Sequence, residues 1–186
     1  MGGLDKGLVR YQQRPLIEWV LDALPPQVVQ RVISCNRNQE IYAHYGQTVA
    51  DQPNAADAKS PFCYAGALAG ILAGLALCLE EWVIVTPCDL VYYPQDFAAV
   101  AWTALSQHLA QHPSAAKIAV AHDGERRQNL CLLLHRDEAA SIAIAMTGSH
   151  AVHAWLDARG ALSIAWPDLR AFTNVNDLTT LEQLGA

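Results

Sequence analysis

Asp89 is the residue whose type and position most directly suggest chemistry, because it follows a short apolar run. Residues 82–86 are mostly β-branched or aromatic, and Pro87 then ends the predicted strand because proline cannot donate a ladder hydrogen bond. A carboxylate at the carboxyl end of a strand can bind a divalent metal and, through it, phosphate oxygens. Aspartate is also common in turns after strands, so position alone leaves both interpretations open.

Other predicted strand ends carry acids or amides. Asn36 and Asp51 each follow a predicted strand, and Asn174 and Asn176 fall at another strand end. The carboxyl ends of parallel strands meet at one edge of an α/β sheet, where such proteins bind ligands. Any one of these residues is more often a turn residue than a ligand contact. Their collective placement favours a ligand crevice over a set of turn caps.

A glycine-rich stretch opens the sequence as M-G-G-L-D-K-G. Gly2 and Gly3 allow the backbone to approach a ligand closely, and Lys6 can neutralise phosphate charge. The stretch is not a P-loop, because the G-x-x-x-x-G-K-[ST] spacing is absent. A frayed N-terminus with a solvated lysine is the alternative interpretation.

Strands and helices alternate along the sequence, which predicts a single α/β domain over residues 1–186 with a doubly wound, mostly parallel sheet. The Asp-Gly pair within residues 122–126 predicts a tight hairpin turn between two of these strands. Strands are predicted at residues 28–34, 47–50, 82–86, 117–121, 130–135, 162–166 and 172–175, and helices at 15–24, 39–45, 65–79, 95–112, 136–146, 150–158 and from 179 onwards.

Two of these elements carry specific packing predictions. Residues 83–85 are all apolar, which predicts a strand buried on both faces. Gly66, Gly70 and Gly74 recur at every fourth position of the helix at 65–79. That spacing also occurs in membrane helix dimers, but the run is too short to span a bilayer. Close packing of the helix on the sheet is therefore the prediction.

Composition restricts the class of protein. The chain has 186 residues, 52% of them apolar and 16% charged, which predicts a folded chain. A net charge of −6 argues against nucleic-acid binding. The five cysteines contain no C-x-x-C pair, which predicts reduced thiols rather than a zinc site or disulfides. With no secretion signal at its start, the sequence predicts a cytoplasmic protein that does not bind membranes.

Several segments resemble molybdenum cofactor guanylyltransferases. M-G-G-x-D-K-G, C-N-R-N-Q-E-I-Y, P-C-D and N-V-N occur in the order found in that family, and the resemblance covers nearly the whole chain. It implies a Rossmann-like nucleotidyltransferase fold and transfer of GMP from GTP to molybdopterin, with release of pyrophosphate and with Mg²⁺ as cofactor. GTP and molybdopterin are the implied partners, and other proteins of molybdenum cofactor biosynthesis are compatible with it.

The resemblance also implies roles for single residues. Asp89 matches the magnesium-binding aspartate, and Lys6 matches the lysine that contacts the nucleotide phosphates. For Arg126, a charged hairpin tip in solvent is an equal alternative to a role beside the second substrate. The implied nucleotide-binding residues are Gly2, Gly3, Lys6, Asn36, Asp51 and Asp89, and those on the second-substrate side are Arg126, Asn174 and Asn176.

The sequence also departs from the family pattern. Family members carry a strand and an L-A-G-G loop ahead of the M-G-G segment, and a chain without that strand is expected to leave ladder groups unpaired in its sheet. Ala67 and Asn129 each occupy a position where the family favours proline. Two other functions therefore stay open: a cytidylyl- or sugar-phosphate nucleotidyltransferase, and a non-catalytic binding protein.

Overall fold

The computed structural model describes residues 5–51, 66–166, 168 and 170–174. Its elements in chain order are η1 (Lys6–Leu8), β1 (Arg10–Tyr11), β2 (Arg14–Pro15), α1 (Leu16–Ala23), β3 (Val32–Ser34), α2 (Gln39–Tyr42), β4 (Gln47–Val49), α3 (Gly66–Leu77), β5 (Trp82–Val85), β6 (Leu90–Tyr92), α4 (Phe97–Gln111), β7 (Ile118–His122), β8 (Arg127–His135), η2 (Arg136–Glu138), α5 (Ala139–Ala145), α6 (Val152–Arg159), β9 (Leu162–Ala165) and β10 (Thr173–Asn174).

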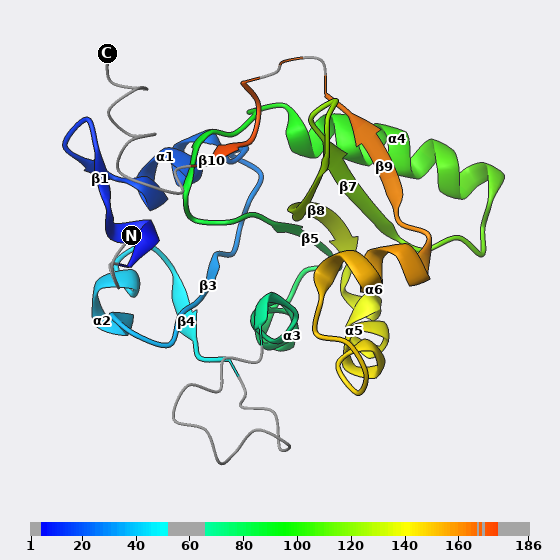
Figure 1. Cartoon of the computed structure of the whole chain (residues 1–186), viewed down its shortest axis with the longest axis horizontal. Coiled ribbons are helices and arrows are strands. Elements are labelled where there is room, and N and C mark those ends of the chain that lie inside the picture. The colour runs from blue at the N-terminus through cyan, green and yellow to red at the C-terminus, as the bar shows by residue number, and fades with distance from the viewer. Residues whose placement is uncertain (1–4, 52–65, 167, 169, 175–186) are drawn as a thin grey trace.

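A four-stranded sheet in the order β5-β8-β7-β9 forms the centre of the fold (Figure 1). β8 pairs antiparallel with β5 and β7, while β7 and β9 are parallel, so β5, β7 and β9 all run the same way. β3 and β4 form a separate parallel pair. β6 pairs antiparallel with β10, and β1 with β2.

Helices cover both faces of the sheet. The side chains of β5 alternate between the two apolar clusters that lie on these faces. Trp82 and Ile84 pack in a cluster with residues of α1 and α4. Val83 and Val85 pack in a second cluster with residues of α3, α5 and α6. This arrangement confirms the predicted doubly wound α/β class, with β8 as the antiparallel member. The assignment of residues 1–186 to one domain stays a prediction.

The predicted burial of residues 83–85 on both faces is wrong in degree. Every residue of β5 is only partly buried, whereas Leu132 and Leu134 of the neighbouring β8 are 0% exposed. The reason is the place of β5 in the sheet. Within the described ranges it is hydrogen-bonded to β8 on one side and to no strand on the other.

Close packing of α3 through its glycines is confirmed at one position. A Cβ added at Gly70 would lie 2.8 Å from Ser34 Oγ and 3.0 Å from Asp51 Oδ1, so only glycine lets α3 approach β3 and β4 this closely. Gly74 has nothing within 4 Å of such a Cβ. Gly66 begins the helix with φ at +74°, a conformation that favours glycine.

The hairpin of β7 and β8 is confirmed, and Asp123 holds its turn. The backbone N–H groups of Glu125 and Arg126 donate to Asp123 Oδ1 at 2.9 and 2.8 Å. Although burial opposes ionisation, these bonds and one from Gln128 lower the pKa of Asp123. No helix among the described residues is long and apolar enough to cross a membrane.

Some predictions fall on residues outside the described ranges. These are the roles of Gly2, Gly3 and Asn176, the loop at 52–64 and the helix from 179 onwards.

Candidate active site

The predicted pair Asn36 and Asp51 is brought together just beyond the carboxyl ends of β3 and β4. Asn36 Nδ2 donates to Asp51 Oδ2 at 3.2 Å, and the backbone N–H of Asp51 donates to Asn36 Oδ1 at 2.9 Å. Ser34, the last residue of β3, donates its hydroxyl to Asp51 Oδ1. The Asp51 carboxylate therefore accepts one hydrogen bond on each oxygen and has a fixed orientation.

Lys6 and Asp89 form a second pair at the carboxyl end of β5. Lys6 Nζ lies 3.2 Å from Asp89 Oδ2. The Asp89 side chain is 10% exposed and that of Lys6 45% exposed, so the carboxylate lies inside the fold and the ammonium reaches solvent. The structure thus joins the two residues that the sequence identified as candidates for charge neutralisation.

Asp5 anchors the loop that carries Lys6. Its Oδ1 accepts a hydrogen bond from the Tyr42 hydroxyl, and its Oδ2 accepts one from Asn38 Nδ2 at 2.9 Å. Arg37 Nε lies 3.5 Å from the same Oδ2. Asn38 has a positive φ of 54° immediately before α2, a conformation that asparagine tolerates better than most residues. The segment after β3 therefore holds the Lys6 loop in place.

Gly7 allows this loop to pack closely against Tyr42 and Cys88. A Cβ at Gly7 would approach the Tyr42 hydroxyl to 2.6 Å and Cys88 Sγ to 3.0 Å. Burial, and then the nearby Asp89 carboxylate, raise the pKa of Cys88 to about 11. The Cys88 thiol is therefore protonated at neutral pH and acts as a packing residue beside Asp89.

The second-substrate residues are placed only in part. The backbone of Asn174 lies opposite Leu90 in the β10–β6 pair, next in sequence to Asp89. Arg126 lies at the β7–β8 turn, 3.8 Å from Asp123 and with 71% of its side chain exposed. The roles assigned to Asn174 and Arg126 stay predictions.

The Asp89 carboxylate suits a hard divalent cation, but one side chain cannot supply a complete set of ligands. The described residues contain no group of three or more His, Cys, Asp or Glu side chains that could hold a metal. Mg²⁺ is commonly bound by one or two carboxylates, with phosphate oxygens and water as the other ligands. The buried Asp89 carboxylate, beside the loop that carries Lys6, fits that mode of binding, in which the substrate supplies many of the metal ligands.

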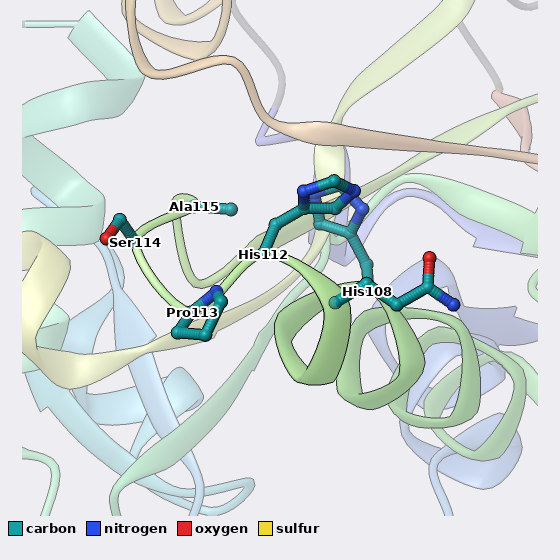
Figure 2. Close-up of a pocket in the computed structure, with 6 residues that line it drawn as sticks. His108, His112, Pro113, Ser114 and Ala115 are labelled. Carbon is teal, nitrogen blue, oxygen red and sulfur yellow. The ribbon is translucent and has the colours of Figure 1, made fainter.

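Two hollows lie away from this edge. One of about 540 Å³ is lined by His108, His112 and Pro113 at the end of α4, and Figure 2 shows the two imidazoles side by side. The other, of about 510 Å³, includes Arg14 and Trp166. Neither is lined by Lys6, Asn36, Asp51 or Asp89, so neither is the candidate site.

Several residues of this edge were not identified as site residues from the sequence, among them Asp5, Ser34 and Tyr42. Asp5 and Ser34 belong to the segments M-G-G-L-D-K-G and S-C-N-R-N, so their sequence context was available. Tyr42 ends the family segment C-N-R-N-Q-E-I-Y and lies in the helix predicted at 39–45. Tyr42 is buried, with 3% of the residue exposed, and its role in the site follows only from the hydrogen bond between its hydroxyl and Asp5.

A cation, a buried carboxylate, a second carboxylate and an amide beyond the carboxyl ends of β3, β4 and β5 define an α/β enzyme class that binds nucleotides or other phosphates. The family model described as the MobA-like NTP transferase domain matches residues 1–163. The chain therefore belongs to the MobA-like NTP transferase family and is a nucleotidyltransferase.

Relatives and solved structures agree with this assignment. Molybdenum cofactor guanylyltransferase of Pasteurella multocida (strain Pm70) is 34% identical over 187 residues, covering 98% of this chain and 90% of that protein. The protein of the same name from Serratia proteamaculans (strain 568) is 38% identical over 178 residues, covering 95% and 83%. Molybdopterin-guanine dinucleotide biosynthesis protein A of Archaeoglobus fulgidus has the same fold, with a TM-score of 0.68 at 16% identity over 97% of this chain and 89% of that one.

Proposed function

We propose that this protein transfers GMP from GTP to molybdopterin, releasing pyrophosphate and forming the guanine dinucleotide form of the cofactor. The observation that carries the proposal is the likeness, over nearly the whole chain, to relatives named molybdenum cofactor guanylyltransferase. The pairing of Lys6 with Asp89, and of Asn36 with Asp51, supports it at the level of single side chains.

The reaction requires no general base from the protein. A terminal phosphate oxygen of molybdopterin bonds to the α-phosphorus of GTP, while the bond from that phosphorus to the oxygen bridging to the β-phosphate breaks and pyrophosphate leaves. The second pKa of such a phosphate is near 6, so the nucleophile is largely ionised at neutral pH. What the protein must supply is positioning and charge neutralisation for two polyanions.

Lys6 and Asp89 supply the charge neutralisation. The Lys6 ammonium lies on the solvent side of the pair and can bind phosphate oxygens directly. Asp89 would hold Mg²⁺, which when bound withdraws charge from the phosphates. Asp5 keeps the Lys6 loop fixed through Tyr42 and Asn38, so the ammonium is oriented before substrate binds.

Asn36 and Asp51 form the nucleoside side of the site in this proposal. Asp51 is held by Ser34 and Asn36, so its carboxylate can accept hydrogen bonds from the base or sugar hydroxyls without losing its orientation. Arg126 and Asn174 are assigned to the molybdopterin side. Proteins that supply or receive molybdopterin are the proposed macromolecular partners.

A cytidylyltransferase is the second candidate. The same fold occurs in 2-C-methyl-D-erythritol 4-phosphate cytidylyltransferase of Thermus thermophilus, with a TM-score of 0.68 at 12% identity over 97% of this chain and 92% of that one. The guanylyltransferase relatives are much closer in sequence, and they favour GTP.

The test is a transfer assay with molybdopterin, Mg²⁺ and either GTP or CTP labelled at the α-phosphate. Labelled dinucleotide is expected from GTP, together with an equal amount of pyrophosphate. Asp89→Asn is expected to lower kcat/KM by about 100-fold or more, whereas Asp96→Asn, an exposed acid before α4, should leave it unchanged. Preference for CTP would move the protein to the second candidate, and an absence of transfer from either nucleotide would refute the proposal.

A further inference from the structure

Two histidines lie four residues apart at the end of α4. The sequence there is H-L-A-Q-H-P, in which His108 belongs to the helix and His112 directly follows its last residue, Gln111. Side chains at positions i and i+4 of an α-helix lie one above the other on the same face. The same spacing holds two zinc-binding histidines on one helix face in the H-E-x-x-H motif. The pattern therefore predicts that the two imidazoles share one side of α4.

Backbone hydrogen bonds fix the place of His112 at the helix end. Its N–H donates to the His108 carbonyl at 2.8 Å, which is the i to i−4 bond of an α-helix. Pro113 has no N–H for the next bond of the helix. The Ala115 N–H instead closes a turn on the His112 carbonyl at 2.9 Å. The two histidines are thus held about one helical turn apart by the backbone.

The separation of the two rings is that of two imidazoles that share one metal ion. Their centroids lie 4.8 Å apart with 46° between the ring planes, and Figure 2 shows the rings side by side. A zinc ion about 2.1 Å from an imidazole nitrogen lies about 3.2 Å from the ring centre. Two rings on one ion then have centres about 4.5 Å apart at a right angle and about 5.2 Å apart at the tetrahedral angle. The observed distance falls between these values, so chelation requires no movement of the helix.

Both imidazoles are available to such an ion. No hydrogen bond joins either ring to another residue of the described ranges, where their ring contact is with each other. His108 is half-buried and His112 exposed, and both line the hollow of about 540 Å³ at the end of α4. A neutral imidazole has one ring nitrogen with a free lone pair. Each ring can therefore offer that nitrogen to an ion from solvent.

The helix end also favours a cation. α4 is 15 residues long, and the unpaired carbonyls at its C-terminus are equivalent to about half a negative elementary charge. Two protonated imidazoles at i and i+4 would repel each other. One ion bound between two neutral imidazoles avoids that repulsion and still places positive charge at the helix end.

We propose that His108 and His112 chelate one divalent transition-metal ion of the zinc type, each through one ring nitrogen, with water as the other ligands. Imidazole suits zinc, nickel and copper, whereas Mg²⁺ prefers oxygen ligands. The described residues contain no group of three or more His, Cys, Asp or Glu side chains that could hold a metal. The pair is therefore an exchangeable two-ligand site rather than a closed structural one.

The proposed site lies at the opposite edge of the sheet from Asp89. β5 and β7 both pair antiparallel with β8 and so run in the same direction. The chain passes from the carboxyl end of β5, where Asp89 lies, through α4 to the amino end of β7. The end of α4 is thus separated from the candidate active site by the length of the strands. The ion binds there whether or not the protein transfers a nucleotide.

The test is a titration of the 186-residue chain with Zn²⁺ alone, followed by NMR of the histidine ring nitrogens. The signals of His108 and His112 should shift together and saturate at one ion per chain. Mg²⁺ at the same concentration should leave both unchanged. His153, an exposed histidine of α6, is the internal reference in the same spectra.

Three variants separate chelation from other zinc binding. His108→Ala should weaken Zn²⁺ binding at His112 by about tenfold or more, because the second nitrogen no longer binds the same ion. Gln107→His combined with His108→Gln keeps the composition but places the two imidazoles about 140° apart around the helix, so it should weaken binding equally. Asp89→Asn should keep the affinity of the unchanged protein, because its carboxylate lies at the other edge.

An absence of shifts, shifts of the two rings at different Zn²⁺ concentrations, or full affinity in the variant with exchanged Gln107 and His108 would overturn the proposal. A shift of His153 at the same Zn²⁺ concentration would do so too, because it would show unselective binding to surface histidines. Saturation at one ion per two chains, with a doubled mass in sedimentation, would assign the ion to a contact between copies and would also overturn it.

Discussion

Replacing Gly70 with alanine should disturb the carboxylate beyond β4 without unfolding the protein. The new Cβ would lie 2.8 Å from Ser34 Oγ and 3.0 Å from Asp51 Oδ1. Real Cβ atoms do not make contacts this short, so Ser34 must turn away or α3 must shift outward. Either movement breaks the hydrogen bond by which Ser34 orients Asp51.

Gly74→Ala is the matched control in the same helix, because its Cβ would have nothing within 4 Å. Alanine there should stabilise the fold by about 0.5–1 kcal/mol, by restricting the unfolded chain and favouring helix. At Gly70 the same gain is opposed by about 1–3 kcal/mol of overpacking. We expect Gly70→Ala to lie about 1–3 kcal/mol below Gly74→Ala in stability, or roughly 2–12 °C in melting temperature for a chain of this size.

Thermal unfolding and GTP titration together separate the two effects. Gly74→Ala should melt above the wild type with unchanged GTP affinity. Gly70→Ala should melt below Gly74→Ala and bind GTP about tenfold more weakly, a loss of about 1.4 kcal/mol. The double variant Ser34→Ala with Gly70→Ala removes the shortest contact, so it should recover stability but not affinity.

The reasoning is refuted if Gly70→Ala and Gly74→Ala melt at the same temperature. Such a result would mean that α3 does not approach β3 and β4 as closely as the structure shows. Weakened GTP binding in Gly74→Ala would be equally damaging, because that position contacts neither Ser34 nor Asp51.

Three further outcomes follow from the structure. Lys6→Ala should lower kcat/KM by about 100-fold in the transfer assay, whereas Lys117→Ala, whose ammonium pairs with an exposed carboxylate, should not change it. Burial opposes ionisation of the Glu138 carboxyl group, but two hydrogen bonds from Arg159 at 2.9 and 3.0 Å help to lower its pKa below the usual 4.5. The stability that ionised Glu138 contributes to the fold is therefore complete above that pH and is lost as the pH falls below it. Glu138→Gln should cost about 2 kcal/mol of stability at neutral pH, and the melting temperature of the variant should fall less steeply as the pH is lowered. The Cys88 thiol, with its pKa raised to about 11, should react with iodoacetamide at pH 8 far more slowly in the folded protein than in urea, as followed by mass spectrometry of its peptide.

The contacts of the candidate site were predictable where they depend on the ends of strands. Asn36, Asp51 and Asp89 each follow an apolar run, and parallel strands bring their carboxyl ends to one edge. The structure joins Asn36 to Asp51 and Lys6 to Asp89. Asp5 was not identified, because an acid in a glycine-rich stretch has no periodic signal, and its role depends on Tyr42 from another element.

Burial was less predictable than position. The apolar residues 83–85 read as a strand covered on both faces, and they do contact clusters on both sides. How much surface they lose depends on the neighbouring strand, which a local pattern does not contain. The spacing of Gly66, Gly70 and Gly74 had the same limit, since only the contact with Ser34 distinguishes the position that requires glycine.

Asp51 and Asp89 are both carboxylates at the same edge, yet their surroundings assign them different tasks. Each oxygen of Asp51 already accepts a hydrogen bond from a side chain, so fewer of its lone pairs are left for a metal. Asp89 pairs with Lys6 through Oδ2, and a lysine on a flexible stem can move to a phosphate while the carboxylate binds Mg²⁺. Mn²⁺ titration in the presence of GTP, followed by electron paramagnetic resonance, should therefore show weaker metal binding in Asp89→Asn. Asp51→Asn should instead weaken GTP binding measured without metal. The opposite pattern would exchange the two assignments.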